Sequence, residues 1–272
     1  MVFRAVLAAA GFCFATITAQ AATVDFNNLP TGALLSGEGL LFGSLTINVS
    51  ASTAGDRPIA VFDTDKPTGD NPSGNDDGDL QLNSGSTCRS VDGGTVAALT
   101  GGCPGSLGKA LVIHEETPGN YSATSGASTL VADGSLSVLN TGVHDPAKVP
   151  DDYAGGGRFT LDFGGDAVTV ASLGVIDIEN GNSYVDVYTN DSTTSPVRRD
   201  FAKLGDASFQ DVIVGVENVT SLEFNLGGSG AIPYIELAGL TPDPTDTNAV
   251  PASGGLGLLL AGLVVAAARP RR

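Results

Sequence analysis

Basic residues, histidine, cysteine and tryptophan are scarce in this chain of 272 residues, and each scarcity narrows the functions it can have. Thirteen lysines and arginines stand against 30 aspartates and glutamates, which gives a net charge of −17. Such a chain does not bind nucleic acid or an anionic membrane surface by charge. There is no tryptophan for a sugar ring to stack on, and the three cysteines and two histidines supply few ligands for a zinc site.

Long apolar runs occur only at the two ends of the chain. At the first end, Arg4 precedes an apolar stretch of 13 residues, 5–17, and the small residues Ala19 and Ala21 follow in the sequence Ala-Gln-Ala. The stretch is shorter than the roughly 20 residues that a membrane-spanning helix needs. Residues 1–21 therefore predict a secretory signal peptide that is cleaved after Ala21.

Export determines how the remaining cysteines and charges are interpreted. Cys13 leaves with the signal peptide, so Cys88 and Cys103 predict one disulfide, with a contribution of roughly 3 kcal/mol in the loop-entropy model. Four of the 13 basic residues lie in the terminal segments, which leaves 9 against 30 acidic residues and a net charge of −21 for the body. We expect this body to attract cations, although solubility in a salty medium explains the charge equally well.

Between Thr23 and Leu240 the sequence shows short alternating or apolar runs, separated by clusters of Gly, Asn, Asp, Ser and Pro, and no amphipathic helix. This pattern is typical of an all-β protein, and we expect a jelly-roll-like β-sandwich with long acidic loops. Residues 22–240 would form one domain, with irregular stretches at 63–108 and 117–157. The expected strands are 23–26, 45–50, 59–62, 110–114, 158–163, 168–173, 175–178, 184–188, 208–214, 221–226 and 232–237.

The second apolar run follows a Pro/Asp/Thr linker at residues 241–249. Residues 250–268 contain no charge, and their 19 residues are just long enough to span a bilayer as a helix. Arg269, Arg271 and Arg272 end the chain and mark the cytoplasmic side. A C-terminal transmembrane tail is expected, either as a permanent anchor or as a processed sorting signal.

The layout of this tail resembles the PEP-CTERM type of bacterial sorting signal. Val250-Pro251-Ala252-Ser253 is similar to its VPLPA variant without the Leu-Pro step, and an apolar helix and a terminal arginine cluster follow. The resemblance implies sorting by a membrane-embedded exosortase-type protease. Ser253-Gly254-Gly255 also resembles the glycine-rich tails that rhomboid-type sorting proteases process. Both classes of protease are therefore retained as hypotheses.

Six segments of the body resemble the β-sandwich domain common among proteins with such tails. They are TVDFNNLPTG, AVFDTDKPTGD, GKALVIHEE, GGGRFTLDF, SLGVIDIENG and GSGAIPYIEL. The resemblance implies a protein of the bacterial cell envelope, cell surface or extracellular matrix, with no established reaction. The chain departs from the family's closing Asp-Asn-Leu, where it has Ile235-Glu236-Leu237.

The acidic loop, residues 63–79, is the densest set of candidate ligands. Calcium takes six to eight oxygens, and flexible loops of Gly, Asn and Asp supply them. A solvated acidic loop is the alternative. Asp25 and Glu236 could form a second, weaker site if the first and last strands are neighbours. The calcium ligands expected in the loop are Asp63, Asp65, Asp70, Asn75, Asp76, Asp77 and Asp79.

Other candidate sites are weaker. Tyr184, Asp186 and Tyr188 lie on one face of an expected strand and could contact an extracellular polysaccharide. His114 and His144 could hold zinc, although no HExxH spacing exists. No catalytic set can be recognised, so the leading hypothesis is a non-catalytic, calcium-stabilised surface or matrix protein. The alternatives are a secreted carbohydrate-active or metal-dependent hydrolase and a carbohydrate-binding module.

Overall fold

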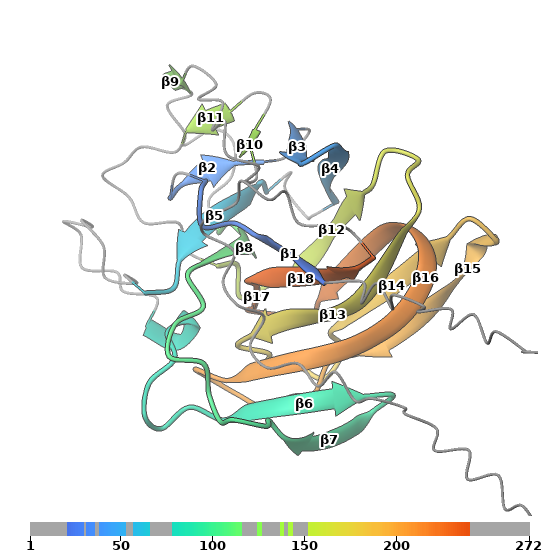
Figure 1. The fold of residues 1–272 in the computed structure, drawn as a ribbon. Helices are drawn as coiled ribbons and strands as arrows, with labels where there is room; N and C mark the ends of the chain where they lie inside the picture. The colour runs from blue at the N-terminus through green and yellow to red at the C-terminus, as the bar shows by residue number, and fades with distance from the viewer. Residues whose placement is uncertain are drawn as a thin grey trace, which may run out of the picture.

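The fold was analysed in a computed structural model of the full chain, shown in Figure 1. The structure describes residues 21–29, 31–35, 38–52, 57–65, 78–115, 124–126, 137–138, 141–143 and 152–239. The expected signal peptide, the linker and the transmembrane tail, with Val250, Pro251 and the three terminal arginines, lie outside these residues. None of the helices in the described part of the chain is long and apolar enough to cross a membrane.

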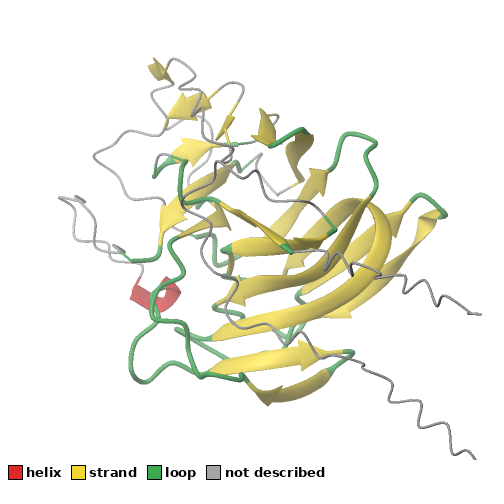
Figure 2. Ribbon diagram, viewed as in Figure 1, coloured by secondary structure: helices red, strands yellow, loops and turns green. Residues whose placement is uncertain are grey.

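The prediction of an all-β protein is confirmed for the described residues, where the only helix is the short 3-10 helix η1 (Gly78–Leu80). Figure 2 shows strands throughout, joined by turns and loops. The strands are β1 (Ala22–Asp25), β2 (Ala33–Leu34), β3 (Glu38–Phe42), β4 (Leu45–Ser52), β5 (Ile59–Asp63), β6 (Cys88–Asp92), β7 (Thr95–Ala98), β8 (Lys109–Ile113), β9 (Thr124–Gly126), β10 (Ser137–Val138), β11 (Thr141–Val143), β12 (Gly157–Asp162), β13 (Val168–Ile176), β14 (Tyr184–Thr189), β15 (Ser192–Asp200), β16 (Phe209–Leu226), β17 (Ala231–Ile232) and β18 (Tyr234–Ala238).

The strands form one curled, almost wholly antiparallel sheet that is organised around β16. The first part of β16 lies between β13 and β6, and its last part lies between β12 and β14. The pairing of β16 with β6 is the parallel one. The strand β16 therefore connects the half of the sheet that contains β6 with the half that contains β12 and β14. The end of β13 pairs with the start of β16, so both lie at the same end of the molecule.

Two predicted strand boundaries are wrong at this strand pair. The strands expected at 168–173 and 175–178 are joined in one strand, β13, which ends at Ile176 and leaves out Asp177 and Ile178. The strands expected at 208–214 and 221–226 are joined in β16, which begins at Phe209. Gly215 and Asn218 resemble a turn in the sequence, and both have positive φ angles, +61° and +57°. Two register shifts between β13 and β16 accommodate the irregularity without ending either strand.

The apolar side chains form one large core and a smaller second cluster. In the large core, Phe159 of β12 stacks on Phe224 of β16 with ring centroids 4.7 Å apart. The smaller cluster lies near the start of β16 and includes Phe209, Ile176 and Leu80. Apolar and polar residues alternate along β12 and the last part of β16, so the apolar side chains of each strand lie on one face, and that face is buried.

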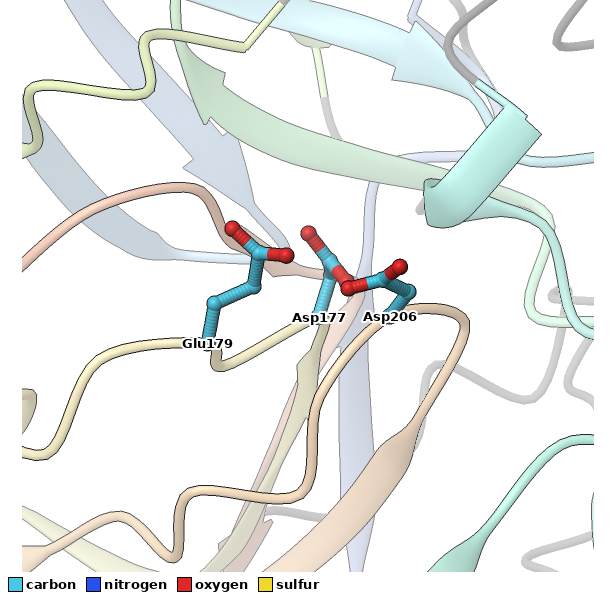
Figure 3. A group of neighbouring side chains, drawn as sticks. All are labelled: Asp177, Glu179 and Asp206. Carbon is cyan, nitrogen blue, oxygen red and sulfur yellow. The ribbon is translucent and has the colours of Figure 1, made fainter.

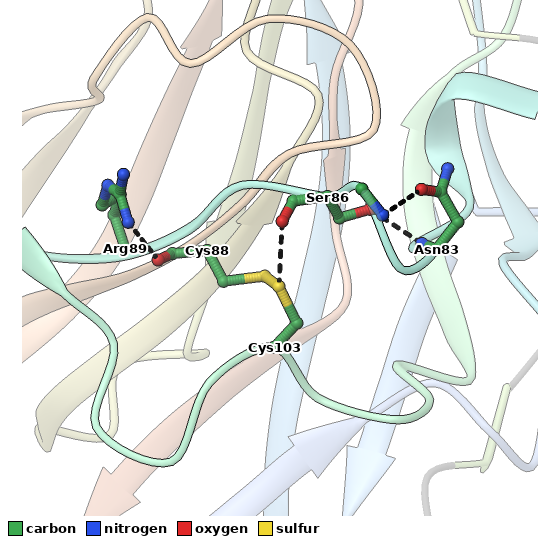
Figure 4. The surroundings of a disulfide bond; sticks show 6 residues. Asn83, Ser86, Cys88, Arg89 and Cys103 are labelled. Atoms are coloured by element: carbon green, nitrogen blue, oxygen red, sulfur yellow. Dashed lines mark hydrogen bonds between the residues drawn. A yellow bond between two sulfur atoms is a disulfide. The ribbon is translucent and has the colours of Figure 1, made fainter.

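The stretch expected to be irregular at 63–108 contains an ordered hairpin of β6 and β7, with Gly93 and Gly94 at the turn. Both glycines have positive φ angles, 53° and 85°, as a two-residue hairpin turn requires. The predicted disulfide is confirmed, since Cys88 at the start of β6 is bonded to Cys103 after β7 (Figure 4). The disulfide closes the hairpin into a covalent loop.

Candidate metal centre

Three carboxylates converge where β13 ends and β16 begins. Asp177 and Glu179 follow β13, and Asp206 precedes β16. Each can place a carboxylate oxygen within 4.8 Å of an oxygen of the other two. Figure 3 shows the carboxylate of Asp177 between those of Glu179 and Asp206, with all three directed toward one another. We call these three residues the acidic cluster.

Backbone hydrogen bonds hold the two chain segments of the cluster together. The amide of Asp177 donates to the carbonyl of Ser208 at 3.0 Å, and the amide of Leu204 donates to the carbonyl of Ile178 at 3.1 Å. Asp177 and Ala207 both have positive φ angles, 57° and 50°. Two non-glycine residues in this sparsely populated region beside one cluster indicate local strain, which is common at functional sites.

The environment of Asp177 is the most unusual feature of the cluster. Its side chain is 0 % exposed, and neither carboxylate oxygen has a hydrogen-bond partner. The Oγ atom of Ser208, 1 % exposed, is also buried without a partner. Buried polar groups are almost always paired, because an unpaired buried charge is strongly destabilising. A cation, a proton or another polar ligand would therefore stabilise these oxygens.

The charges around Asp177 make such a ligand more favourable. Burial raises the pKa of Asp177 to about 8, and the neighbouring carboxylates of Asp79, Asp152, Glu179 and Asp206 add to the rise. The pKa of Glu179 is raised chiefly by a hydrogen bond to Asp206. Several carboxyl groups thus repel one another unless a cation or a proton neutralises them.

The geometry of the acidic cluster suits a calcium ion. Two oxygens bound to one Ca²⁺ at 2.3–2.6 Å lie at most about 5 Å apart, so one ion can contact three carboxylates that span 4.8 Å. Mg²⁺ usually keeps several waters and is held by one or two carboxylates. Three converging carboxylates, one of which has both oxygens buried and unpaired, could therefore hold a calcium ion.

The acidic loop behaves differently where the structure describes it. An oxygen of Asp63 accepts a hydrogen bond from the amide of Asp65 at 3.2 Å, and an oxygen of Asp65 accepts one from Ser106 at 2.6 Å. Of the three predicted ligands that the structure describes, Asp79 in η1 is the one whose charge acts on Asp177. The other four predicted ligands, Asp70, Asn75, Asp76 and Asp77, lie outside the described residues.

The second predicted metal site is only partly assembled. The first and last strands of the domain, β1 and β18, pair as that hypothesis required, with Asp25 opposite Tyr234 and Glu236 opposite Thr23. The carboxylate of Glu236 instead accepts a hydrogen bond from Ser172 at 3.1 Å. Within the described residues, Asp25 and Glu236 belong to no group of three metal-ligating side chains.

The predicted sugar-binding strip is held by internal contacts. Tyr184, Asp186 and Tyr188 lie along β14 with the buried Val185 and Val187 alternating between them. Two nitrogens of Arg198 donate to the two carboxylate oxygens of Asp186, both at 2.8 Å. The guanidinium of Arg198 also lies 3.6 Å from the centroid of the Tyr184 ring. One tyrosine face and the central acceptor of the strip are thus already occupied.

His114, which was a candidate zinc ligand, and the nearby Ser229 are both buried. His114 is 1 % exposed and forms an isolated β-bridge with Asp152. Ser229 is 7 % exposed, and its hydroxyl donates to a carboxylate oxygen of Asp152 at 3.3 Å. The amide of Gly230 donates to the other oxygen at 2.6 Å. His144 lies outside the described residues, and the acidic cluster is the one group of three ligating side chains found within them.

No protein-family model, curated protein or solved structure matches the chain. Only the geometry of its own residues supports a metal centre. Sequence reasoning missed the acidic cluster because its members lie in two short loops, at DIE (177–179) and at Asp206. The signal available was weak: carboxylates at the ends of two apolar strands that prove to be neighbours.

Proposed function

We propose that this chain is an exported, non-catalytic β-domain protein of a bacterial cell surface or extracellular matrix, and that a calcium ion at Asp177, Glu179 and Asp206 stabilises its body. The observation that carries the calcium assignment is the fully buried Asp177 carboxylate with no hydrogen-bond partner. A disulfide and a body charge of −21 suit an environment that is oxidising and contains divalent cations.

We also infer that the two halves of the curled sheet act as the layers of a jelly-roll-like sandwich. Side chains of β12 and β14 share one apolar cluster with side chains of β13 and β18. This interior is the scaffold on which the loops after β13 and before β16 are held. A structural cation at the rim of such a scaffold neutralises the carboxylates that repel one another there.

The location of the protein would be set by its tail. In this proposal residues 250–268 span the membrane, Arg269, Arg271 and Arg272 stay in the cytoplasm, and an exosortase-type or rhomboid-type protease processes the tail near Val250 and Pro251. The resemblance to PEP-CTERM signals supports this step. The hydrolase and carbohydrate-binding alternatives receive less support, because Asp186, Tyr184, His114 and Ser229 are engaged or buried.

Calorimetric titration of the mature body tests the calcium assignment. After treatment with a chelator, the protein should bind about one Ca²⁺ per chain and bind Mg²⁺ at least 10-fold more weakly, since three carboxylates favour the larger ion. Asp177→Asn should abolish the calcium heat. Asp166→Asn, an exposed carboxylate in the turn after β12, is the matched control and should leave binding unchanged. If the parent protein does not bind calcium, the proposed calcium site is wrong.

The tail is tested in native cells. Replacing Arg269, Arg271 and Arg272 by neutral residues should leave the protein unsorted, because these charges set the orientation and halt transfer through the membrane. The readout is the mass of the C-terminus and the cell fraction that contains the protein. Identical processing and location of the triple variant would exclude the arginines as the signal, and an uncut wild-type tail would favour a permanent anchor.

A further inference from the structure

The segment from Gly78 to Leu107, which contains η1, β6, β7 and the disulfide, is an excursion from the body of the domain. We call it the disulfide excursion. It contacts the body through the parallel pairing of β6 with the start of β16. It also supplies Leu80, Leu82, Leu99 and Leu107 to the smaller apolar cluster, together with Cys88. Both contacts lie beside the acidic cluster, because that apolar cluster also contains residues from the end of β13 and the start of β16.

Asp79 connects the disulfide excursion to the acidic cluster. Its neighbour Leu80 is 0 % exposed, which fixes η1 against the body, and the Oδ1 atom of Asp79 is buried without a hydrogen-bond partner. The ribbon of η1 is visible at the upper right of Figure 3, on the side of Asp206. The charge of Asp79 acts on both Asp177 and Glu179. Asp79 in the excursion and Asp177 in the body each have a buried oxygen without a partner, and one cation bound between them would satisfy both.

We propose that the side chain of Asp79 turns toward the ion when calcium binds and becomes a fourth ligand residue, so that the ion is a clasp that fastens the disulfide excursion to the body. In the structure, Asp79 lies outside the group whose carboxylate oxygens are within 4.8 Å of one another. The inference rests on the proposed calcium site and deepens it. Asp79 lies 98 positions before Asp177 in the numbering, so the ion would link two segments that the disulfide does not cross-link. The disulfide cannot do so, because Cys88 and Cys103 both belong to the excursion.

The clasp predicts a specific dynamic effect. Parts of a protein open locally with their own free energies, and a ligand that binds only the closed form suppresses opening by the factor 1 + [L]/Kd. Detachment of the excursion removes Asp79 from the ion, so calcium should suppress this opening. At a calcium concentration 100 times the dissociation constant the suppression is at most roughly 100-fold, and it is smaller to the extent that the three carboxylates of the body bind the ion in the open form. If Asp79 were not a ligand, the excursion would detach with calcium still bound to the body.

Hydrogen exchange with mass spectrometry on the full body measures this opening. The amides of β6 report on the pairing with β16, and the amides of β14, in the opposite half of the sheet, report on the rest of the domain. In chelator we expect β6 to exchange faster than β14. Calcium should slow exchange in β6 by up to ~100-fold. Asp79→Asn should lose most of this slowing, and Asp92→Asn, an exposed acid in the β6–β7 turn, should keep it.

The outcomes separate the clasp from the calcium site itself, because calorimetric titration is performed on the same samples. If the parent binds calcium but β6 exchange is independent of calcium, the clasp is wrong and the calcium site stands. The same conclusion follows if Asp79→Asn keeps the full slowing, or if β6 and β14 exchange at equal rates in chelator. If the parent does not bind calcium, both the clasp and the proposed function fail.

Discussion

The acidic loop and the acidic cluster differ in the property that makes carboxylates a metal site. The loop, residues 63–79, gathers its acids within a short stretch of sequence, and Asp63 and Asp65 at its first end accept hydrogen bonds from neighbouring groups. The acidic cluster has only three acids, from two separate loops, but Asp177 is buried and unpaired. Many acidic residues close together in the sequence attract cations without a defined site. A buried carboxylate without a hydrogen-bond partner favours one ligand at a defined position.

The physical reason lies in the surroundings of the charges. Exposed carboxylates repel one another weakly, because water and salt screen their interaction within a Debye length of about 8–10 Å. Buried carboxylates lack that screening, and the free energy of an unpaired buried charge is high. We therefore expect a cation at the acidic cluster to change the stability more than a cation near the exposed Asp65 does.

Removal of the disulfide has the largest expected effect. It tests whether the covalent bond or the proposed ion contributes more to the stability of the disulfide excursion. Replacing Cys88 and Cys103 by serine should lower the stability by roughly 3 kcal/mol. At about 2–4 °C per kcal/mol, the melting midpoint should fall by about 6–12 °C. Calorimetry measures the midpoint in calcium and in chelator.

The disulfide variant has a clear control. Thiol labelling of the denatured, non-reduced parent should find no free cysteine, and two labelled thiols would contradict the bridge. The calcium-dependent part of the midpoint should persist in the serine variant, because the acidic cluster contains no cysteine. A variant that no longer responds to calcium would show that the two stabilising devices are not independent.

Calcium removal has the next largest expected effect and compares the two acidic regions directly. At 100 times its dissociation constant, calcium should stabilise the body by roughly 2.7 kcal/mol. The midpoint in chelator should then be about 5–10 °C lower than in calcium. The triple variant Asp177→Asn, Glu179→Gln, Asp206→Asn should lose this difference. The loop variant Asp63→Asn, Asp65→Asn, Asp77→Asn should keep it.

Magnesium at equal ionic strength is the control for charge screening in this melting experiment. Equal melting midpoints in calcium and magnesium would show that the cations only screen the charges of the acidic cluster and that no calcium-specific site exists there. A loop variant that loses the calcium response, with the cluster variant retaining it, would reverse the comparison and return the site to residues 63–79.

The smallest expected effect concerns acids that are half-buried but paired. Asp211 accepts a hydrogen bond from the hydroxyl of Tyr234 at 3.1 Å, and burial raises its pKa above the ordinary value of 3.8. A raised pKa means that the folded state binds the proton more tightly than the unfolded state. This contribution is complete below the unfolded pKa and is lost as the pH rises through the folded one.

Asp211→Asn should remove this pH dependence, since the amide oxygen can still accept from Tyr234. Relative to the variant, the parent should lose stability between pH 4 and pH 8 with calcium held constant. Midpoints measured at both pH values give the difference. A parent that gains stability relative to the variant over this range would contradict the assigned direction of the shift.

Much of the strand content could be predicted because burial imposes a simple period on the sequence. In β12, Phe159 and Leu161 alternate with polar residues, and one face is buried as expected. β15 was not predicted, because Ser192–Asp200 contains a proline and three charges and has no apolar alternation. Its strand form depends on pairing with β14, which is a tertiary contact. The β6–β7 hairpin was missed for a related reason, since Thr95–Ala98 is fully exposed and shows no buried face.

The sequence by itself determined the features that depend on composition and local pattern. These are the all-β class, the pairing of Cys88 with Cys103, the strong negative charge and the expected export and sorting signals at the two ends. Only the tertiary structure decided which carboxylates meet, because convergence depends on strand pairing. The continuous strand β16 and its pairing with β13 bring Asp206 to Asp177, and burial between these strands removes the water that would otherwise solvate the charge.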